Sequence, residues 1–324
     1  MKKIHFSNLL LLLCVVAVLQ ACERDENLPS HIKAPTEAGF KALRAKALEN
    51  ITQKKIFNGE TGIEFTSKQG AELFIFPNCL IDETNTIVTG EVEMTFIEIY
   101  DRGNMVLTNK PVMAKDPETG HSVPLITGGQ YLLEVKQGDK KLRGCHYRLN
   151  VPGDLTGGVD TDMVLWDGTI DDDGNLIYEN VTDRQSYIEF GETLTEYGVI
   201  HDRFHWCNID KYLNYDGPKT RIKVHVPSAY NSKNSAVYVA FSEENNALAQ
   251  LDTYNETEKY FSEHYGFVPV DKTAHIIFIS ESEGSAVYVI KSATIVENQP
   301  ITIDTNELQT GTLEQVIALI NALN

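Results

Sequence analysis

Basic residues are scarce in this sequence relative to acidic ones. It holds 28 lysines and arginines against 46 aspartates and glutamates, for a formal net charge of -18 over 324 residues. Proteins that bind nucleic acid need clustered lysine and arginine to neutralise phosphates, and docking on anionic lipid needs the same positive charge. The acid excess therefore argues against nucleic acid as a partner and against electrostatic attachment to a membrane.

Cysteine and recognised catalytic motifs are scarce as well. The chain has five cysteines, too few for a disulfide framework at this length. Cys79, Cys145 and Cys207 lie beyond the N-terminal region and allow at most one pair, which the sequence does not assign. There is no G-x-S-x-G, H-E-x-x-H or P-loop motif. We therefore expect no enzyme activity, no catalytic residues and no resident cofactor.

The N-terminus carries the longest apolar run, at residues 9–19, preceded by Lys2 and Lys3. About eleven apolar residues suit the core of a signal peptide and fall short of the about 20 that span a bilayer. The run ends in Leu19-Gln20-Ala21-Cys22, which resembles the bacterial lipobox. We expect residues 1–21 to be a lipoprotein signal peptide and Cys22 to be acylated. A plain signal peptide that happens to contain Cys22 is the alternative.

An acylated Cys22 would bind the protein to the membrane through its lipid, because each buried CH₂ group contributes about 0.8 kcal/mol. Residues 22–38 are polar and contain two prolines, and we interpret them as a tether. Within them, Glu23-Arg24-Asp25-Glu26 resembles the tag of surface-exposed lipoproteins in Bacteroidota; an acidic, solvated tether is the alternative. The expected location is the cell envelope, as an outer-membrane lipoprotein.

The body that follows has the pattern of β-strands between two helices. Residues 39–57 predict a helix, because their apolar positions recur about every 3.6 residues. Residues 58–216 show short alternating strands; in residues 91–99, for example, Val92, Met94 and Phe96 share one face with Glu98, as in half-buried antiparallel strands. Gly128-Gly129 is interpreted as a turn.

A second β-rich region begins at Gly217-Pro218. Residues 217–306 again alternate, and residues 307–324 predict a C-terminal helix that starts with a capping box at Thr312. Strands and helices do not alternate along the chain, which disfavours a parallel α/β fold. The predicted fold is mainly β, with tandem antiparallel β-sandwich domains.

The first β-rich region resembles a known family. GAELFIFPNCL at residues 70–80, followed by VTGEV at 88–92, is similar to a pattern of ZU5-like β-sandwich domains that also occurs in uncharacterised Bacteroidota envelope lipoproteins. GGQYLLEV at 128–135 and FHWCNIDKY at 204–212 resemble later elements of those lipoproteins, although Cys207 precedes Asn208, which departs from the usual order. The resemblance implies a ZU5-like sandwich over residues 58–216 and supplies no catalytic residues. ZU5 domains elsewhere are mostly protein-interaction modules.

Two polar motifs could hold metal ions. His201 and His205, spaced by four, could act with Cys207 as ligands; the alternative is a packed aromatic strand with partly exposed histidines. The run from Asp171 to Asn175 could hold calcium, but it lacks a full twelve-residue loop with its distal glutamate. We interpret this run as the turn of a hairpin and expect no metal at either motif.

Other candidates concern nucleophiles and ligand binding. Cys145-His146 and the pair of His205 with Cys207 could form a nucleophile and a base, but adjacent residues on a strand point to opposite faces. Aromatic residues gather between positions 254 and 267, and Tyr254, Tyr260 and Tyr265 are the candidates for stacking on a sugar or peptide. The alternative is that these rings cover the core.

Three functions follow as hypotheses. The first is a non-catalytic interaction or accessory module of an outer-membrane assembly, with an envelope protein as partner. The second is a surface lipoprotein that binds a glycan or a peptide. A cryptic hydrolase ranks last.

The leader yields the first testable prediction. In cells fed an alkyne-tagged fatty acid, the full chain should become labelled, whereas Cys22→Ser should lose the label because the acylated thiol is gone. Cys14→Ser, which changes a cysteine inside the leader, should be labelled like the wild type. Equal labelling of the Cys22→Ser variant would contradict the assignment.

Overall fold

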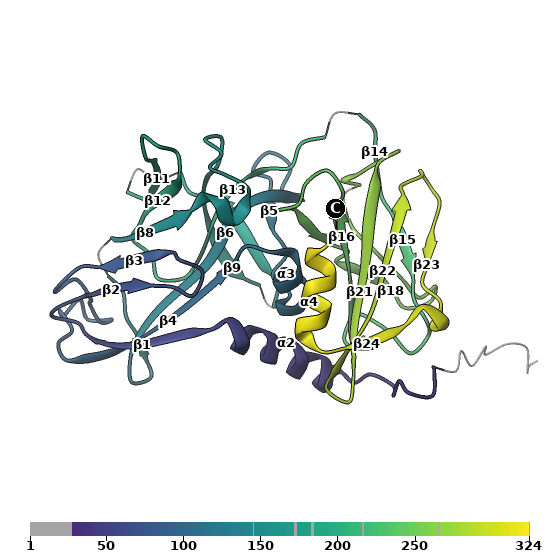
Figure 1. Cartoon of the computed structure of the whole chain (residues 1–324), viewed down its shortest axis with the longest axis horizontal. Helices are drawn as coiled ribbons and strands as arrows, with labels where there is room; N and C mark the ends of the chain where they lie inside the picture. The colour runs from purple at the N-terminus through teal and green to yellow at the C-terminus, as the bar shows by residue number, and fades with distance from the viewer. Residues whose placement is uncertain are drawn as a thin grey trace, which may run out of the picture.

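The computed structural model describes residues 28–323, except 145, 172–173, 183–184, 216 and 265. Cys22 and the expected signal peptide therefore lie outside the described residues. The described chain is mainly β with three α-helices, which confirms the predicted fold class. Figure 1 shows two β-rich blocks with the helices between them.

The first block is a sandwich of two sheets. The large sheet contains, in spatial order, β1 (Gln53–Asn58), β4 (Glu91–Ile99), β6 (Ser122–Gln137), β13 (Trp206–Tyr212), β9 (Val164–Ile170), β10 (Leu176–Asn180) and β5 (Met113–Lys115), with β7 (Lys140–Lys141) paired to β6. The small sheet contains β11 (Tyr187–Phe190), β12 (Glu196–His201), β8 (Tyr147–Pro152), β3 (Glu72–Ile75) and β2 (Ile63–Thr66). A 3₁₀ turn, η1 (Gly153–Thr156), follows β8.

The second block has one longer sheet and two shorter ones. The second-block sheet contains β17 (Leu248–Gln250), β16 (Ser235–Phe241), β21 (Thr273–Ser282), β22 (Ser285–Thr294) and β24 (Gln309–Gly311). Facing it lie β18 (Thr253–Asn255), β19 (Tyr260–Ser262), β15 (Lys223–His225) and β23 (Ile301–Thr302), beside the pair β14 (Lys219–Thr220) and β20 (Val268–Pro269). The pairings of β5 with β10 and of β15 with β23 are parallel, unlike the all-antiparallel prediction, because long connections bring these short strands together.

Strand β4 shows how sequence pattern becomes packing. Val92, Met94 and Phe96 are buried between the two sheets of the first block, as their alternation predicts. Glu98 continues that face and is only 3 % exposed. Its carboxylate accepts hydrogen bonds from donors on β1, on the turn before β3 and at the end of β4, namely Gln53 Nε2, Ser67 Oγ, Gln69 N and Tyr100 Oη. A buried carboxylate is tolerated only when it is bonded in this way.

Gly128-Gly129 corrects a predicted turn. Both glycines lie inside the long strand β6, where the register against β13 shifts between Asn208 and Asp210. Gly129 has φ of 129°, and a Cβ there would lie 2.1 Å from Tyr131 Oη. The pair therefore forms a β-bulge, in which glycine supplies the backbone conformation and the space.

The N-terminal helix ends earlier than predicted. Helix α2 spans Glu37–Ile51, with Thr36 as N-cap, instead of residues 39–57. Thr52 adopts an extended conformation, and the next residues join the large sheet as β1, paired with β4 from Gln53↔Phe96 to Asn58↔Glu91. The ladder satisfies backbone groups that a longer helix would have bonded internally, so tertiary pairing overrides the local helical pattern.

The C-terminal helix is also shorter than the predicted span of residues 307–324. A 3₁₀ turn, η2 (Thr305–Glu307), and strand β24 come first, and helix α4 spans Leu313–Asn321. The capping box at Thr312 is confirmed: Thr312 and Gln315 hydrogen-bond reciprocally between side chain and backbone. Residues 309–311 extend because they pair with β22.

The described part of the predicted tether is attached to the body. Ile32 is buried in the core of the second block. The backbone N–H of Lys33 donates to Ser282 Oγ, and that of Thr36 donates to Glu281 Oε1, each at 2.9 Å. The expectation of a free tether over residues 22–38 is therefore corrected for residues 28–36, because apolar burial at Ile32 fixes the segment.

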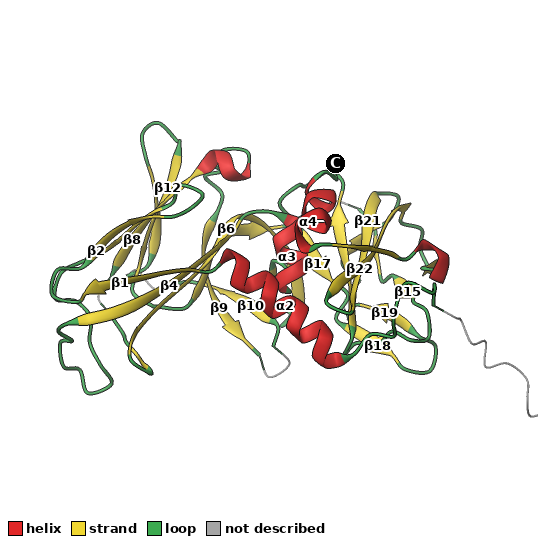
Figure 2. Ribbon diagram, turned by 60° about the horizontal axis from the view of Figure 1, so that its bottom comes forward, coloured by secondary structure: helices red, strands yellow, loops and turns green. Residues whose placement is uncertain are grey.

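Three helices form a layer between the blocks (Figure 2). Helices α2, α3 (Arg102–Thr108) and α4 pack against the outer face of the second-block sheet and one end of the large sheet. Arg102, 3 % exposed, reaches across to the second block and donates to the carbonyls of Phe241, Glu244 and Ala247. Burial lowers the pKa of Arg102 to about 10, so the guanidinium stays charged at neutral pH.

The helix layer yields a prediction at Gly103. A Cβ on Gly103 would lie 2.7 Å from the carbonyl oxygen of Ile317 in α4. Gly103→Ala should therefore destabilise the protein by about 1–3 kcal/mol in urea unfolding, because the two helix backbones must separate. Gly191→Ala is the control, since no atom lies within 4 Å of its Cβ position. Equal stability of the two variants would show that the helices can shift freely.

Candidate functional site

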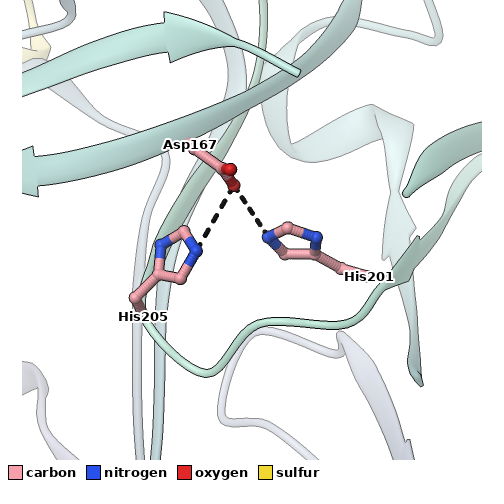
Figure 3. Close-up of side chains that lie close together, drawn as sticks. All are labelled: Asp167, His201 and His205. Atoms are coloured by element: carbon pink, nitrogen blue, oxygen red, sulfur yellow. Dashed lines mark ion pairs between the residues drawn. The ribbon is translucent and has the colours of Figure 1, made fainter. Parts of the chain in front are cut away.

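Asp167, His201 and His205 converge where the chain crosses between the two sheets of the first block (Figure 3). Asp167 lies in β9 of the large sheet, and His201 is the last residue of β12 in the small sheet. His205 immediately precedes β13, which returns the chain to the large sheet. The cluster therefore includes residues from both sheets.

The three side chains approach one another closely. His201 Nε2 lies 2.9 Å from Asp167 Oδ1, and His205 Nε2 lies 3.4 Å from the same oxygen. The imidazole rings are nearly perpendicular, at 77°. The side chain of His201 is fully buried, and those of Asp167 and His205 are 16 % and 30 % exposed. Asp167 Oδ1 and His201 Nε2 are buried and have no hydrogen-bond partner of suitable geometry in the described chain.

Hydrogen bonds on the far side of each ring define the histidine tautomers. Ser186 Oγ donates to Asp202 Oδ1 at 3.0 Å and lies 2.8 Å from His201 Nδ1. A hydroxyl has one proton, so Ser186 accepts from His201 Nδ1–H. His205 Nδ1 lies 2.5 Å from the carbonyl oxygen of Trp206, which can only accept. Both Nδ1 atoms therefore carry a proton, and each ring turns its Nε2 toward Asp167.

Charges around the cluster keep Asp167 ionised. Burial raises the pKa of Asp167, but the neighbouring His201, His205 and Arg203 outweigh it and hold the pKa below its usual value. Arg203 Nη1 forms an ion pair with Asp167 Oδ2, which leaves Oδ1 facing the histidines. Burial lowers the pKa of His205, and the charge of Asp167 only partly opposes this, so His205 is neutral at physiological pH.

Cys207 is not part of the cluster, although the sequence grouped it with the two histidines. It lies opposite Asp167 on the neighbouring strand, but it is 1 % exposed and its Sγ contacts Tyr147 Oη at 3.5 Å. Burial raises the pKa of the Cys207 thiol to about 12. His201 is fully buried rather than partly exposed as the packed-strand alternative held.

The other cysteines bear on the disulfide prediction. Cys207 is free, whereas Cys79 is disulfide-bonded. Cys145 lies outside the described residues, so the structure does not test Cys145-His146 as a catalytic pair, an interpretation that strand geometry disfavours.

The acidic run at Asp171 is a hairpin turn in its described residues. Strands β9 and β10 pair antiparallel on either side of it. Asn175 N donates to Asp171 Oδ1 at 2.8 Å, and Gly174 has φ of 83°. Asp172 and Asp173 lie outside the described residues. The carboxylate of Asp171 is thus used to close the turn.

The tyrosine candidates are not brought to one face. Tyr254 in β18 pairs with Phe261 in β19, so Tyr260, one residue earlier, points to the opposite side. Tyr254 Oη donates to the carbonyl oxygen of Tyr230 at 2.8 Å. Tyr260 lies beneath Lys223 Nζ, 4.7 Å from the ring centroid. Tyr265 lies outside the described residues.

Asp167 is the site residue that sequence reasoning missed. It lies 34 positions before His201, and nothing in its local pattern distinguishes it from a solvent-facing strand residue. Only the pairing of β9 with β13 places it beside the histidines. Comparison of the chain with models of known protein families and with curated proteins finds no match. Among the described residues, no helix is long and apolar enough to cross a membrane.

The state of Cys207 yields a prediction. When the full chain is treated with iodoacetamide at mildly alkaline pH, Cys207 should stay unmodified in the native protein, because its thiol is buried and protonated. The same residue should be modified once guanidinium unfolds the chain. Peptide mapping by mass spectrometry reads both states. Rapid native labelling would make Cys207 an accessible nucleophile and revive the hydrolase hypothesis.

Proposed function

We propose that this chain is a lipid-anchored, non-catalytic protein of the cell envelope that serves as an interaction module of an outer-membrane assembly. The observation that carries the proposal is the motif Leu19-Gln20-Ala21-Cys22 at the end of a leader that resembles a signal peptide. The resemblance of residues 60–215 to the ZU5-like region of Bacteroidota envelope lipoproteins supports it. The depth and raised pKa of Cys207 disfavour a thiol hydrolase.

The attachment of residues 28–36 would orient the body. Five residues lie between Cys22 and Leu28, so the six Cα–Cα steps span at most about 20 Å when fully extended. Ile32, Lys33 and Thr36 hold the next segment on the second block. A lipid on Cys22 would thus keep the second block near the membrane and leave β1, β2 and β3 of the first block at the far end of the molecule (Figure 1).

The far end of the first block exposes large apolar side chains. Ile56, Phe76 and Ile87 are 65 %, 49 % and 53 % exposed. Gly59, just after β1, connects the three segments that carry these side chains. Its N–H donates to the carbonyl of Gly90, and its carbonyl accepts from the N–H of Asn78. Large apolar side chains that are exposed at one end of a block are available for contact with another protein. We propose this end as the contact for the envelope partner.

Binding of a glycan or peptide is the second candidate that the sequence raised. Tyr254 and Tyr260 lie on opposite faces of the β18–β19 hairpin, so they cannot sandwich one ligand. The geometry therefore favours the interaction module over this alternative.

Affinity purification tests the proposal. The C-terminally tagged full chain, extracted in mild detergent, should carry an outer-membrane protein in near-equal amount. Replacing the far-end residues together (Ile56→Thr, Phe76→Ser, Ile87→Thr) should reduce recovery of that protein by about tenfold, as loss of about 1.4 kcal/mol of binding free energy would do.

The control replaces exposed apolar residues away from the far end, Val296→Thr with Leu319→Ser, and should retain the partner. A chain that is recovered alone from its own envelope would refute the interaction function. A far-end variant that keeps full recovery would refute the proposed contact.

A further inference from the structure

We infer that Asp167, His201 and His205 form a binding site for one divalent transition-metal ion, with Zn²⁺ as the best-fitting ion, that joins the two sheets of the first block. The inference stands apart from the proposed function, since it concerns only the geometry of these three side chains. It rests on potential ligand atoms that face one another, on ligand spacing, and on the groups that hold the rings.

The first argument is that three potential ligand atoms meet, and that two of them lack a hydrogen bond of suitable geometry. Asp167 Oδ1 faces the Nε2 atoms of His201 and His205, and the Nδ1 atoms of both rings are bonded elsewhere. Buried polar atoms without partners are costly. A cation placed among them would satisfy all three atoms at once.

The second argument is distance. Two ligand atoms that each lie 2.0–2.1 Å from a tetrahedral Zn²⁺ are about 3.4 Å apart. The oxygen of Asp167 lies 2.9 Å and 3.4 Å from the two Nε2 atoms, and all three atoms lie within 4.8 Å of one another. The two oxygen–nitrogen distances are therefore within about half an ångström of the spacing that the ion needs, and the two Nε2 atoms lie at most 4.8 Å apart.

The third argument is the support behind each ligand. Metal-binding histidines donate their second N–H to a carbonyl, a carboxylate or another fixed acceptor. Here Ser186, itself bonded to Asp202, accepts from His201, and the Trp206 carbonyl accepts from His205. Arg203 holds the second oxygen of Asp167, which leaves Oδ1 as a single-atom ligand.

The ligand set selects the class of ion. Imidazole suits zinc, copper, iron and nickel, whereas calcium and magnesium prefer sites made only of oxygen. Two histidines and one carboxylate at tetrahedral spacing fit Zn²⁺ with a water molecule as fourth ligand. The partly exposed side chains of His205 and Arg203 give the ion a path from solvent.

The position of the site indicates what the ion would do. Asp167 lies in β9 of the large sheet, and His205 lies just before β13 of the same sheet. His201 is the last residue of β12 in the small sheet. Among the described residues, the two sheets share no hydrogen-bonded strand ladder, and side chains pack between them. A metal bound here would fasten one sheet to the other, as structural zinc does in small domains.

Metal titration of the full chain in mild detergent tests the inference. After treatment with a chelator and its removal, the protein should bind one Zn²⁺ per chain by calorimetry. Its Tm should rise by about 5 °C when free Zn²⁺ is a hundred times its Kd. Ser186→Ala removes a group that only supports a ligand, so it should weaken Zn²⁺ binding by about 10–100-fold. His205→Gln removes a ligand itself and should weaken Zn²⁺ binding by more than that range.

Matched variants separate loss of the site from loss of the fold. His264→Gln, which alters a histidine paired with Asp252 in the second block, should bind like the wild type. His205→Gln should match the wild-type circular dichroism and Tm in chelator; if it does not, Asp167→Asn replaces it as the test. Absence of binding by the wild-type chain, or equal affinity of the ligand variant, would overturn the inference.

Discussion

Burial of both faces of the second-block sheet is the constraint on which the arrangement of the two blocks depends. In β16, Val237, Val239 and Phe241 face the core of the second block, whereas Ala236, Tyr238 and Ala240 face the helix layer. A sheet with two apolar faces needs a cover on each side. Helices α2, α3 and α4 supply the second cover, and their other sides pack on the end of the large sheet. The helix layer thereby joins the blocks through one continuous apolar core.

The same layer determines where the N-terminal segment lies. Helix α2 runs along the boundary between the blocks, and its start is fixed by Glu281 of β21, which accepts from the Thr36 backbone. Gly39 lies so close to that carboxylate that a Cβ would be 2.3 Å from its oxygen. The helix therefore cannot move away from the second block without breaking this junction. An anchor that precedes the helix would act on the second block first and reach the first block only through the helix layer.

Buried polar groups connect separate elements of the first block at two places. Glu98 joins β1 and the turn before β3 to β4 by hydrogen bonds, so a carboxylate on an apolar strand face becomes a fixed junction between sheets. Asp167, His201 and His205 form a second junction, where three potential ligand atoms face one another. The two junctions differ in their hydrogen bonds: Glu98 accepts from four donors within the protein, whereas Asp167 Oδ1 and His201 Nε2 have no hydrogen-bond partner of suitable geometry in the described chain. The proposed ion belongs to the second junction for this reason.

The sequence by itself determined the features that depend only on residues close together in the chain. The alternation in residues 91–99, the capping box at Thr312 and the hairpin at Asp171 all depend on residues within a few positions, and the structure confirms them. The lipobox-like motif at Cys22 is equally local and stays a prediction. Tertiary structure alone decided that residues 53–58 leave the helix for β1, that Gly128-Gly129 forms a bulge, and that Asp167 joins the histidines. Each of these depends on a strand partner 33 or more positions away, and a hydrogen-bonded ladder leaves no trace in the local pattern of either strand.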